Sequence, residues 1–184
     1  VRNIMNRCMD AIDSSDNLFA FRQILPVDTV LVRAVSEGVL NCMLFIVMLT
    51  GAGMFGVPVI PHDPFGALVA LGGLWLLGIG LGLTFSVFAT LVPEFGRLLR
   101  LIHTPLYFFS AVMIPSVVLP ITIREVLLLN PILHGLEALR VAFTPTYQVP
   151  PGIDVLFVYQ CAIPLIMLGL ALHVRYRLRI LTTT

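Results

Sequence analysis

Long uncharged stretches set the organisation of this chain. Residues 65–91 are the clearest, because 27 consecutive positions carry no charged side chain. About 20 apolar residues are enough for a helix to cross the bilayer core, and a helix of a soluble protein would keep a polar stripe. We therefore predict a membrane-spanning helix over residues 65–91. Gly78 and Gly82 have the spacing of close helix contacts, so their face is expected to pack against another helix.

Three further stretches without Asp, Glu, Lys or Arg predict spans over residues 39–60, 102–119 and 155–174. The middle one is unusual, because it contains Pro105 and Pro115. A proline inside a helix removes a hydrogen bond and kinks it, and broken helices at membrane depth lie against protein or a water-filled path. This span is therefore either the wall of a conduit or a kinked packing helix. The fold class that follows is an all-α polytopic membrane protein with four spans.

Residues 121–143 predict two short helices separated by Asn130 and Pro131. Neither is long enough to cross a bilayer, so both are expected in or on the outer leaflet. The second is amphipathic: Ile132, Leu136, Leu139 and Phe143 share one face, and His134, Glu137 and Arg140 share the other.

The polar face of this second short helix could suggest a metal or acid–base site, because His134 and Glu137 are three residues apart. No third ligand is near in sequence, and Arg140 follows Glu137 by one helical turn. We therefore favour a structural ion pair and predict no metal ligand and no catalytic residue in the chain.

Residues 17–25 predict about two turns of helix with exposed apolar side chains, ending at Pro26. Such a segment between two membrane elements can be an interfacial helix, a docking site for a partner, or a loop on lipid headgroups. Asp28 is expected to be the N-cap of a long helix that begins at Thr29.

The arginines fix the orientation of the predicted spans, because Arg is retained on the cytoplasmic side. The nine that fall on one side are Arg2, Arg7, Arg22, Arg33, Arg97, Arg100, Arg175, Arg177 and Arg179. Only Arg124 and Arg140 fall on the other side. We therefore predict that residue 91 lies at the cytoplasmic end of its span and residue 65 at the outer end.

Composition narrows the function. The chain is 58% hydrophobic and 11% charged, as in a polytopic membrane protein. It contains no Lys, so it cannot carry the nucleotide-binding loop that requires one, and any ATP would be hydrolysed by another chain. A net charge of +1 excludes a nucleic-acid reader. The three scattered cysteines suit neither a disulfide framework nor a metal site.

The spans also argue against other membrane activities. They hold no charged group at mid-depth, where proton-coupled carriers normally keep one. An intramembrane glycan-modifying enzyme would need several polar groups at one depth. The candidates are scattered, namely Asn41, Thr50, Thr84, Ser110 and Gln160.

Three stretches together resemble the membrane subunit of bacterial ABC exporters of the type-2 permease class, most closely the capsular polysaccharide export permeases. They are NLFAFRQILPVDTVLVRA (17–34), TPLYFFSAVMIP (104–115) and LLNPILHGLEALR (128–140). Permeases for O-antigen and teichoic acid are also similar, and a permease for a lipid or drug stays open as an alternative.

The resemblance implies six spans per subunit, a homodimer and two ATPase subunits that use ATP and Mg, with no cofactor bound by this chain. We expect the chain to lack the first span and most of the second. The implied substrate is a lipid-linked polysaccharide, moved across the bacterial inner membrane, where membrane lipid surrounds the protein. Periplasmic and outer-membrane export proteins are possible further partners.

The resemblance also implies residue roles. Residues 17–25 match the coupling helix, and residues 121–143 match the gate helices near the outer exit. The implied ATPase-docking residues are Asn17, Leu18, Phe19, Phe21, Arg22 and Asp28. Aromatic side chains that could line the substrate path, or equally face lipid, are Tyr107, Phe108, Phe109, Phe143 and Tyr147.

Overall fold

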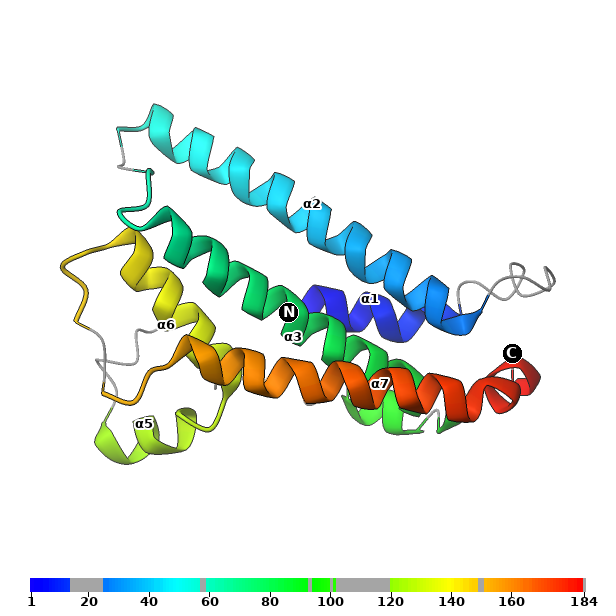
Figure 1. The fold of residues 1–184 in the computed structure, drawn as a ribbon. Helices are drawn as coiled ribbons and strands as arrows, with labels where there is room; N and C mark the ends of the chain where they lie inside the picture. The colour runs from blue at the N-terminus through cyan, green and yellow to red at the C-terminus, as the bar shows by residue number, and fades with distance from the viewer. Residues whose placement is uncertain are drawn as a thin grey trace.

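The computed structural model describes residues 1–13, 25–56, 59–92, 94–99, 101, 120–148 and 151–183. They form α1 (Arg2–Asp13), α2 (Pro26–Met54), α3 (Pro64–Leu91), α5 (Ile121–Leu127), α6 (Pro131–Phe143) and α7 (Val155–Thr183). In Figure 1, α2, α3 and α7 run lengthwise through the molecule, with α5 and α6 gathered at one end. No strand occurs within these ranges, so the all-helical prediction is confirmed for them.

The helix α2 begins and ends earlier than predicted. It starts at Pro26 rather than Thr29, because proline fits the first helical position, where no N–H is needed. It ends at Met54 rather than near residue 60. The N–H groups of Phe55 and Gly56 bond back to Ala52 and Gly53 at 3.1 and 3.0 Å, and Gly56 adopts a φ of +78°. A residue with positive φ ends a helix, so the predicted span 39–60 is too long at its outer end.

The helix α3 matches its prediction within one residue. Asp63 is the N-cap, because its carboxylate accepts the N–H of Gly66 at 2.9 Å. Pro64 occupies the first helical position. With these two start signals next to an uncharged stretch, the sequence determines this helix almost completely.

The helix α3 lies at the centre of the bundle and uses glycines on two of its faces. A methyl group added at Gly82 would lie 2.8 Å from Cys8 Cβ on α1, and one added at Gly78 would lie 3.3 Å from Ile4. The predicted contact face is confirmed, and its partner is α1. On another face, a methyl group at Gly80 would lie 3.1 Å from the Ala162 carbonyl oxygen of α7.

Hydroxyl groups join α3 to α7 at two depths. The Tyr159 hydroxyl donates to the Val69 carbonyl at 2.7 Å. The Thr84 hydroxyl shares its proton between the Gly80 carbonyl of α3 at 2.9 Å and the Leu165 carbonyl of α7 at 3.1 Å. Such interhelical bonds in a membrane contribute about 0.6 kcal/mol each. The helix α7 continues nine residues beyond the predicted end at 174, because Arg and Leu there favour helix and residues 175–183 contain no Gly or Pro.

The helices α5 and α6 are the two short helices that the sequence predicts, and their outer location stays a prediction. The Asn130 side chain caps α6 by accepting the N–H of Ile132 at 3.0 Å, and Pro131 takes the first helical position. The helix α5 ends at Leu127, two residues before the predicted end.

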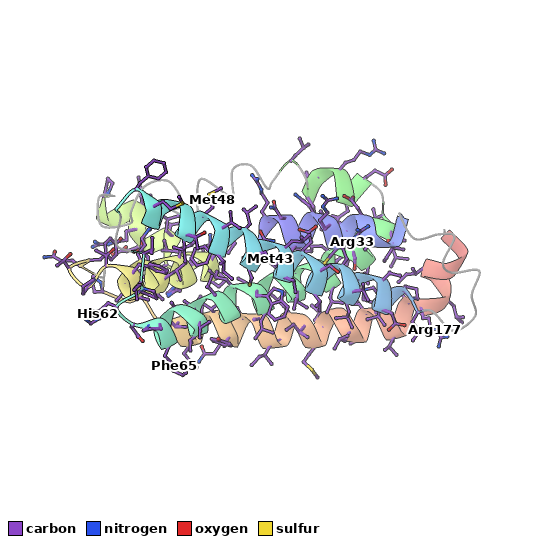
Figure 2. All side chains as sticks on the ribbon, turned by 90° about the horizontal axis from the view of Figure 1, so that it is seen from above. Arg33, Met43, Met48, His62, Phe65 and Arg177 are labelled. Carbon is purple, nitrogen blue, oxygen red and sulfur yellow. The ribbon has the colours of Figure 1, made fainter. Side chains whose placement is uncertain are left out.

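Residues far apart in the sequence lie at the same end of the bundle. In Figure 2, Arg33 and Arg177 lie at one end, while His62 and Phe65 lie at the other. Within the part of the chain that the structure describes, three helices are long and apolar enough to cross a membrane, namely Pro26–Met54, Pro64–Leu91 and Val155–Ile180. The protein is thus a multi-pass membrane protein. The fourth predicted span, 102–119, falls outside the described ranges.

Candidate functional site

The predicted functional residues divide into those that the structure describes and those that it does not. Outside the described residues lie Asn17, Leu18, Phe19, Phe21, Arg22, Tyr107, Phe108 and Phe109. The predicted coupling helix therefore stays a prediction, as does the aromatic part of the fourth span. Asp28, His134, Glu137, Arg140, Phe143 and Tyr147 can be placed.

Asp28 is not the N-cap of α2, as predicted, but its third helical residue. Its Oδ2 accepts the backbone N–H of Leu25, the true N-cap, at 3.0 Å. A carboxylate in the first turn also interacts favourably with the positive end of the helix dipole. Asp28 thus holds the start of α2 in place at the end of the segment 17–25.

The polar face of α6 is turned into the protein. His134 is 4% exposed and Glu137 is 0% exposed, whereas Ile132, Leu136 and Leu139 are only partly buried. The amphipathic pattern was therefore predicted correctly, but its inward orientation was not. A buried carboxylate is costly unless it is paired and hydrogen-bonded, so its partners decide whether this arrangement is stable.

Glu137 has a partner for each carboxylate oxygen. The Arg140 guanidinium donates to Oε1 at 2.7 Å, as the predicted ion pair requires, and the Tyr147 hydroxyl donates to Oε2 at 2.6 Å. Burial, together with the Glu137 hydrogen bond, raises the pKa of Tyr147 to about 12. Tyr147 therefore remains a donor at physiological pH and ties the loop after α6 to the helix.

His134 connects three elements through one ring. Its Nδ1 accepts the backbone N–H of Asp154, directly before α7, at 3.0 Å. Because Nδ1 is an acceptor, the proton lies on Nε2, which donates to the Leu128 carbonyl after α5 at 2.7 Å. The ring also packs on Phe157 of α7 with centroids 4.9 Å apart. His134 thus joins α5, α6 and α7 in a single neutral tautomer.

Phe143 contacts α2. Its ring meets Phe45 edge-on, with centroids 6.0 Å apart and an interplanar angle of 89°. Edge-to-face contact is a favoured aromatic geometry. Of the two candidate lining aromatics that can be placed, Phe143 packs against α2 and Tyr147 donates to Glu137.

The structure also shows polar contacts that the sequence did not predict. Ser86 of α3 lies 3.1 Å from His173 Nε2 of α7, and both side chains are buried. Arg7 of α1 pairs with Glu37 of α2 at 3.2 Å. The hydroxyl residues Thr84, Ser86 and Thr90 in an otherwise apolar helix were the available signal, because polar residues in spans usually face protein.

A cavity of about 520 Å³ lies between α1, α2, α3 and α6. Apolar side chains dominate its wall, among them Phe45, Met48, Leu71, Leu74, Trp75 and Leu136. Such a wall suits hydrocarbon better than an ion. Among the residues that the structure describes, no group of three or more His, Cys, Asp or Glu side chains could hold a metal.

Comparison with known proteins gives one family and several relatives. Residues 16–144 match the family model described as ABC-2 type transporter. The polysialic acid transport protein KpsM of Escherichia coli is 29% identical over 171 residues, which cover 93% of this chain and 66% of the relative. The capsule polysaccharide export inner-membrane protein CtrC of Neisseria meningitidis serogroup A is 25% identical over 179 residues, covering 95% of this chain and 66% of the relative. The chain therefore spans just under two thirds of the length of these curated relatives.

Proposed function

The chain belongs to the ABC-2 type transporter family, and we propose that it is the permease subunit of an ATP-driven exporter of capsule-type, lipid-linked polysaccharide in the bacterial inner membrane. The observation that carries the substrate class is the similarity to KpsM and CtrC over more than nine tenths of this chain. The three apolar helices suit a membrane-embedded subunit.

The proposal assigns energy supply to a second chain. This sequence has no Lys for a phosphate-binding loop, so we propose that two copies of a separate ATPase bind ATP and Mg and drive a permease homodimer. The segment 17–25 is the proposed coupling helix, and its apolar side chains Leu18, Phe19 and Phe21 would contact the ATPase. Asn17 and Arg22 would flank this contact, and Asp28 would hold α2 behind it.

The two short helices α5 and α6 are the proposed gate helices at the outer end. The polar side chains of α6 hold helices and loops together, since the polar atoms of Glu137 and His134 form hydrogen bonds within the protein. We therefore assign His134, Glu137 and Arg140 a structural role in this gate. The sugars would instead contact the aromatic residues of the segment 102–119 and, after export, the periplasmic and outer-membrane partners.

Deletion of the gene with complementation tests the proposed function. In the deletion strain, we expect surface polysaccharide to be lost and lipid-linked polysaccharide to accumulate inside the cell. The full-length gene should restore the surface polysaccharide and remove the accumulation. Co-purification in detergent should recover an ATPase chain. Intact surface polysaccharide in the deletion strain would exclude the proposed substrate class, and a change in O-antigen or teichoic acid instead would reassign it.

A further inference from the structure

We infer that the outer cap, defined as α5 and α6, is fastened to α3 and α7 so that the four helices move as one rigid unit, with His134 as the positioning residue. Within the proposed function, this means that the outer end opens by displacement of the whole unit and not by a swing of the cap on α7. The inference rests on the proposed function only for this last step.

The first fastening holds α6 against α3 at two points. A methyl group added at Gly135 would lie 2.6 Å from Leu74 Cγ and Cδ2 of α3, so the backbone of α6 is seated directly on that side chain. Seven residues later, the Ala142 carbonyl accepts the N–H of Asp63, the N-cap of α3, at 3.1 Å. Two points about 10 Å apart along one helix oppose rotation of α6 across α3.

The second fastening joins the cap to α7 through His134. The ring accepts the Asp154 N–H, donates to the Leu128 carbonyl and stacks near Phe157. Because the side chain is 4% exposed, water cannot readily replace either bond, and an unpaired buried polar group is costly. A swing of the cap away from α7 would break the Asp154 bond and the contact with Phe157 at once.

The helices α3 and α7 in turn are packed closely with one another. Gly80 brings α3 within 3.1 Å of the backbone of α7, measured from the position of an added methyl group, and Thr84 and Tyr159 bond across the same interface. Cap, α3 and α7 therefore form a closed circuit of contacts. In a closed circuit, no single hinge allows one member to move alone.

A disulfide between α3 and α6 tests the rigid unit. With Cys8, Cys42 and Cys161 replaced by Ala, the variants Leu74→Cys and Gly135→Cys are combined, which removes the Leu74 atoms that a new side chain at 135 would meet. In a disulfide, the Cβ of one cysteine lies about 3 Å from the sulfur of the other. A Cβ added at position 135 would lie 2.6 Å from Leu74 Cγ, which is close to where the sulfur of a cysteine at 74 would lie. The matched controls are Leu74→Cys alone and Gly135→Cys combined with Leu74→Ala, because Gly135→Cys alone would meet the Leu74 side chain.

The expected result is near-complete cross-linking in isolated membranes, to the same extent with and without ATP. Export by the oxidised double variant should equal export by the reduced one. Cross-linking that changes with ATP, or export that is lost on oxidation and restored by reductant, would overturn the rigid unit. If neither the unmodified gene nor the reduced variant restores surface polysaccharide, the proposed function is wrong. The extent of cross-linking with and without ATP then still decides whether the four helices form a rigid unit.

Amide hydrogen exchange tests the role of His134. In His134→Asn, the side-chain oxygen can take the place of Nδ1 and keep the Asp154 bond, whereas His134→Gln can reach only toward the Leu128 carbonyl. The exchange rate of the peptide that contains Asp154 should rise about tenfold in His134→Gln and in His134→Leu, and should stay near the wild-type rate in His134→Asn. Equal rates in all three variants would show that His134 does not position α7.

Discussion

At the residue scale, the buried polar side chains of α6 are the main feature of this protein. Glu137 is fully buried and yet fully bonded, through Arg140 and Tyr147. His134 is equally committed, since both ring nitrogens have backbone partners. A buried pair of this kind contributes little net stability when intact, but removal of one partner is expensive. These residues therefore fix one arrangement of the outer end and disfavour others.

Loss of the charge at Glu137 should destabilise the protein by about 2 kcal/mol, because Arg140 loses its ionic partner in a largely buried site. The variant Glu137→Gln keeps the side-chain volume. Its matched control is Glu94→Gln, because Glu94 also pairs with an arginine three residues on, but at 3.7 Å and with both side chains about three quarters exposed. That exposed pair should contribute less than about 0.5 kcal/mol. Denaturant unfolding in micelles measures both free energies, and equal effects would contradict the buried role of Glu137.

Tyr147 should titrate at unusually high pH. Its pKa is raised from 10 to about 12, first by burial and then by its hydrogen bond to Glu137, so the folded state favours the neutral phenol. The stability that this bond contributes is present below pH 10 and is lost as the pH rises toward 12. The difference in phenolate absorbance between wild type and Tyr147→Phe should show a midpoint near 12, which Glu137→Gln should lower. A midpoint near 10 in the wild type would refute the contact.

At the element scale, α3 organises the bundle because its small residues allow other helices to approach on several sides. Gly78 and Gly82 receive α1, and Gly80 receives α7. The spacing of the glycines predicted a contact face, but α1 and α7 could not be identified as the two neighbours from α3 alone. Packing in membranes depends on such close approach, since lipid is as apolar as the helices themselves.

The variant Gly80→Ala should separate α3 from α7 and cost about 2 kcal/mol, because backbone atoms of α7 cannot move aside as a flexible side chain can. The control is Gly51→Ala in α2, where nothing lies within 4 Å of an added methyl group. That control should be neutral or slightly stabilising, since Ala favours helix over Gly. Thermal unfolding in the same detergent compares the two variants. A loss of stability in Gly51→Ala as large as in Gly80→Ala would show that the cost is not one of packing.

For the segment 17–25, the proposed coupling role gives a functional prediction. The variant Phe19→Asp should abolish permease-stimulated ATPase activity and export while leaving membrane insertion intact, because a charge would replace an apolar docking contact. Phe55→Asp is the control, since Phe55 is 89% exposed just after α2 at the opposite end of that helix. ATPase assays in proteoliposomes and a membrane fractionation blot provide the measurements. Normal export by Phe19→Asp would rule out docking at this residue.

At the scale of the whole molecule, the positive side chains and the helix directions give one consistent orientation. Arg33 and Arg177 share one end, and His62 lies at the other (Figure 2). Because Arg is retained on the cytoplasmic side of bacterial inner membranes, we expect the end with α5 and α6 to face outward. In this predicted orientation, the Glu137 and His134 networks lie on the outer side, away from the proposed ATPase.

Cysteine labelling tests this orientation. In the protein without native cysteines, His62→Cys should react with a membrane-impermeant maleimide in intact cells, because His62 is exposed at the outer end. Arg177→Cys, also exposed, should react only after the inner membrane is opened. The reverse pattern would invert the topology and remove the basis for docking near residue 19.

The sequence by itself determined the three long helices that the structure describes, and it predicted the direction in which they cross the membrane. Uncharged length marks α3, and Asp63 and Pro64 mark its start. The distribution of arginines gives the orientation, and three family-like stretches give the class of protein. Each of these features depends on a short stretch of sequence or on a count along the whole chain. They can therefore be read without knowing which residues contact one another in the fold. Helix ends were less certain, because the start of α2 depends on Pro26 and its end on the backbone of Gly56.

Only the tertiary structure decided which faces meet and which polar groups are buried. The pattern of α6 separated two faces, but the burial of Glu137 depends on Tyr147, ten residues away. The role of His134 depends on Asp154, twenty residues away, and the Ser86–His173 contact joins residues 87 positions apart. Side-chain periodicity shows which polar or apolar residues share one face of a helix. It contains no information on the neighbour against which that helix packs, and the neighbour determines whether a polar face is solvated or buried.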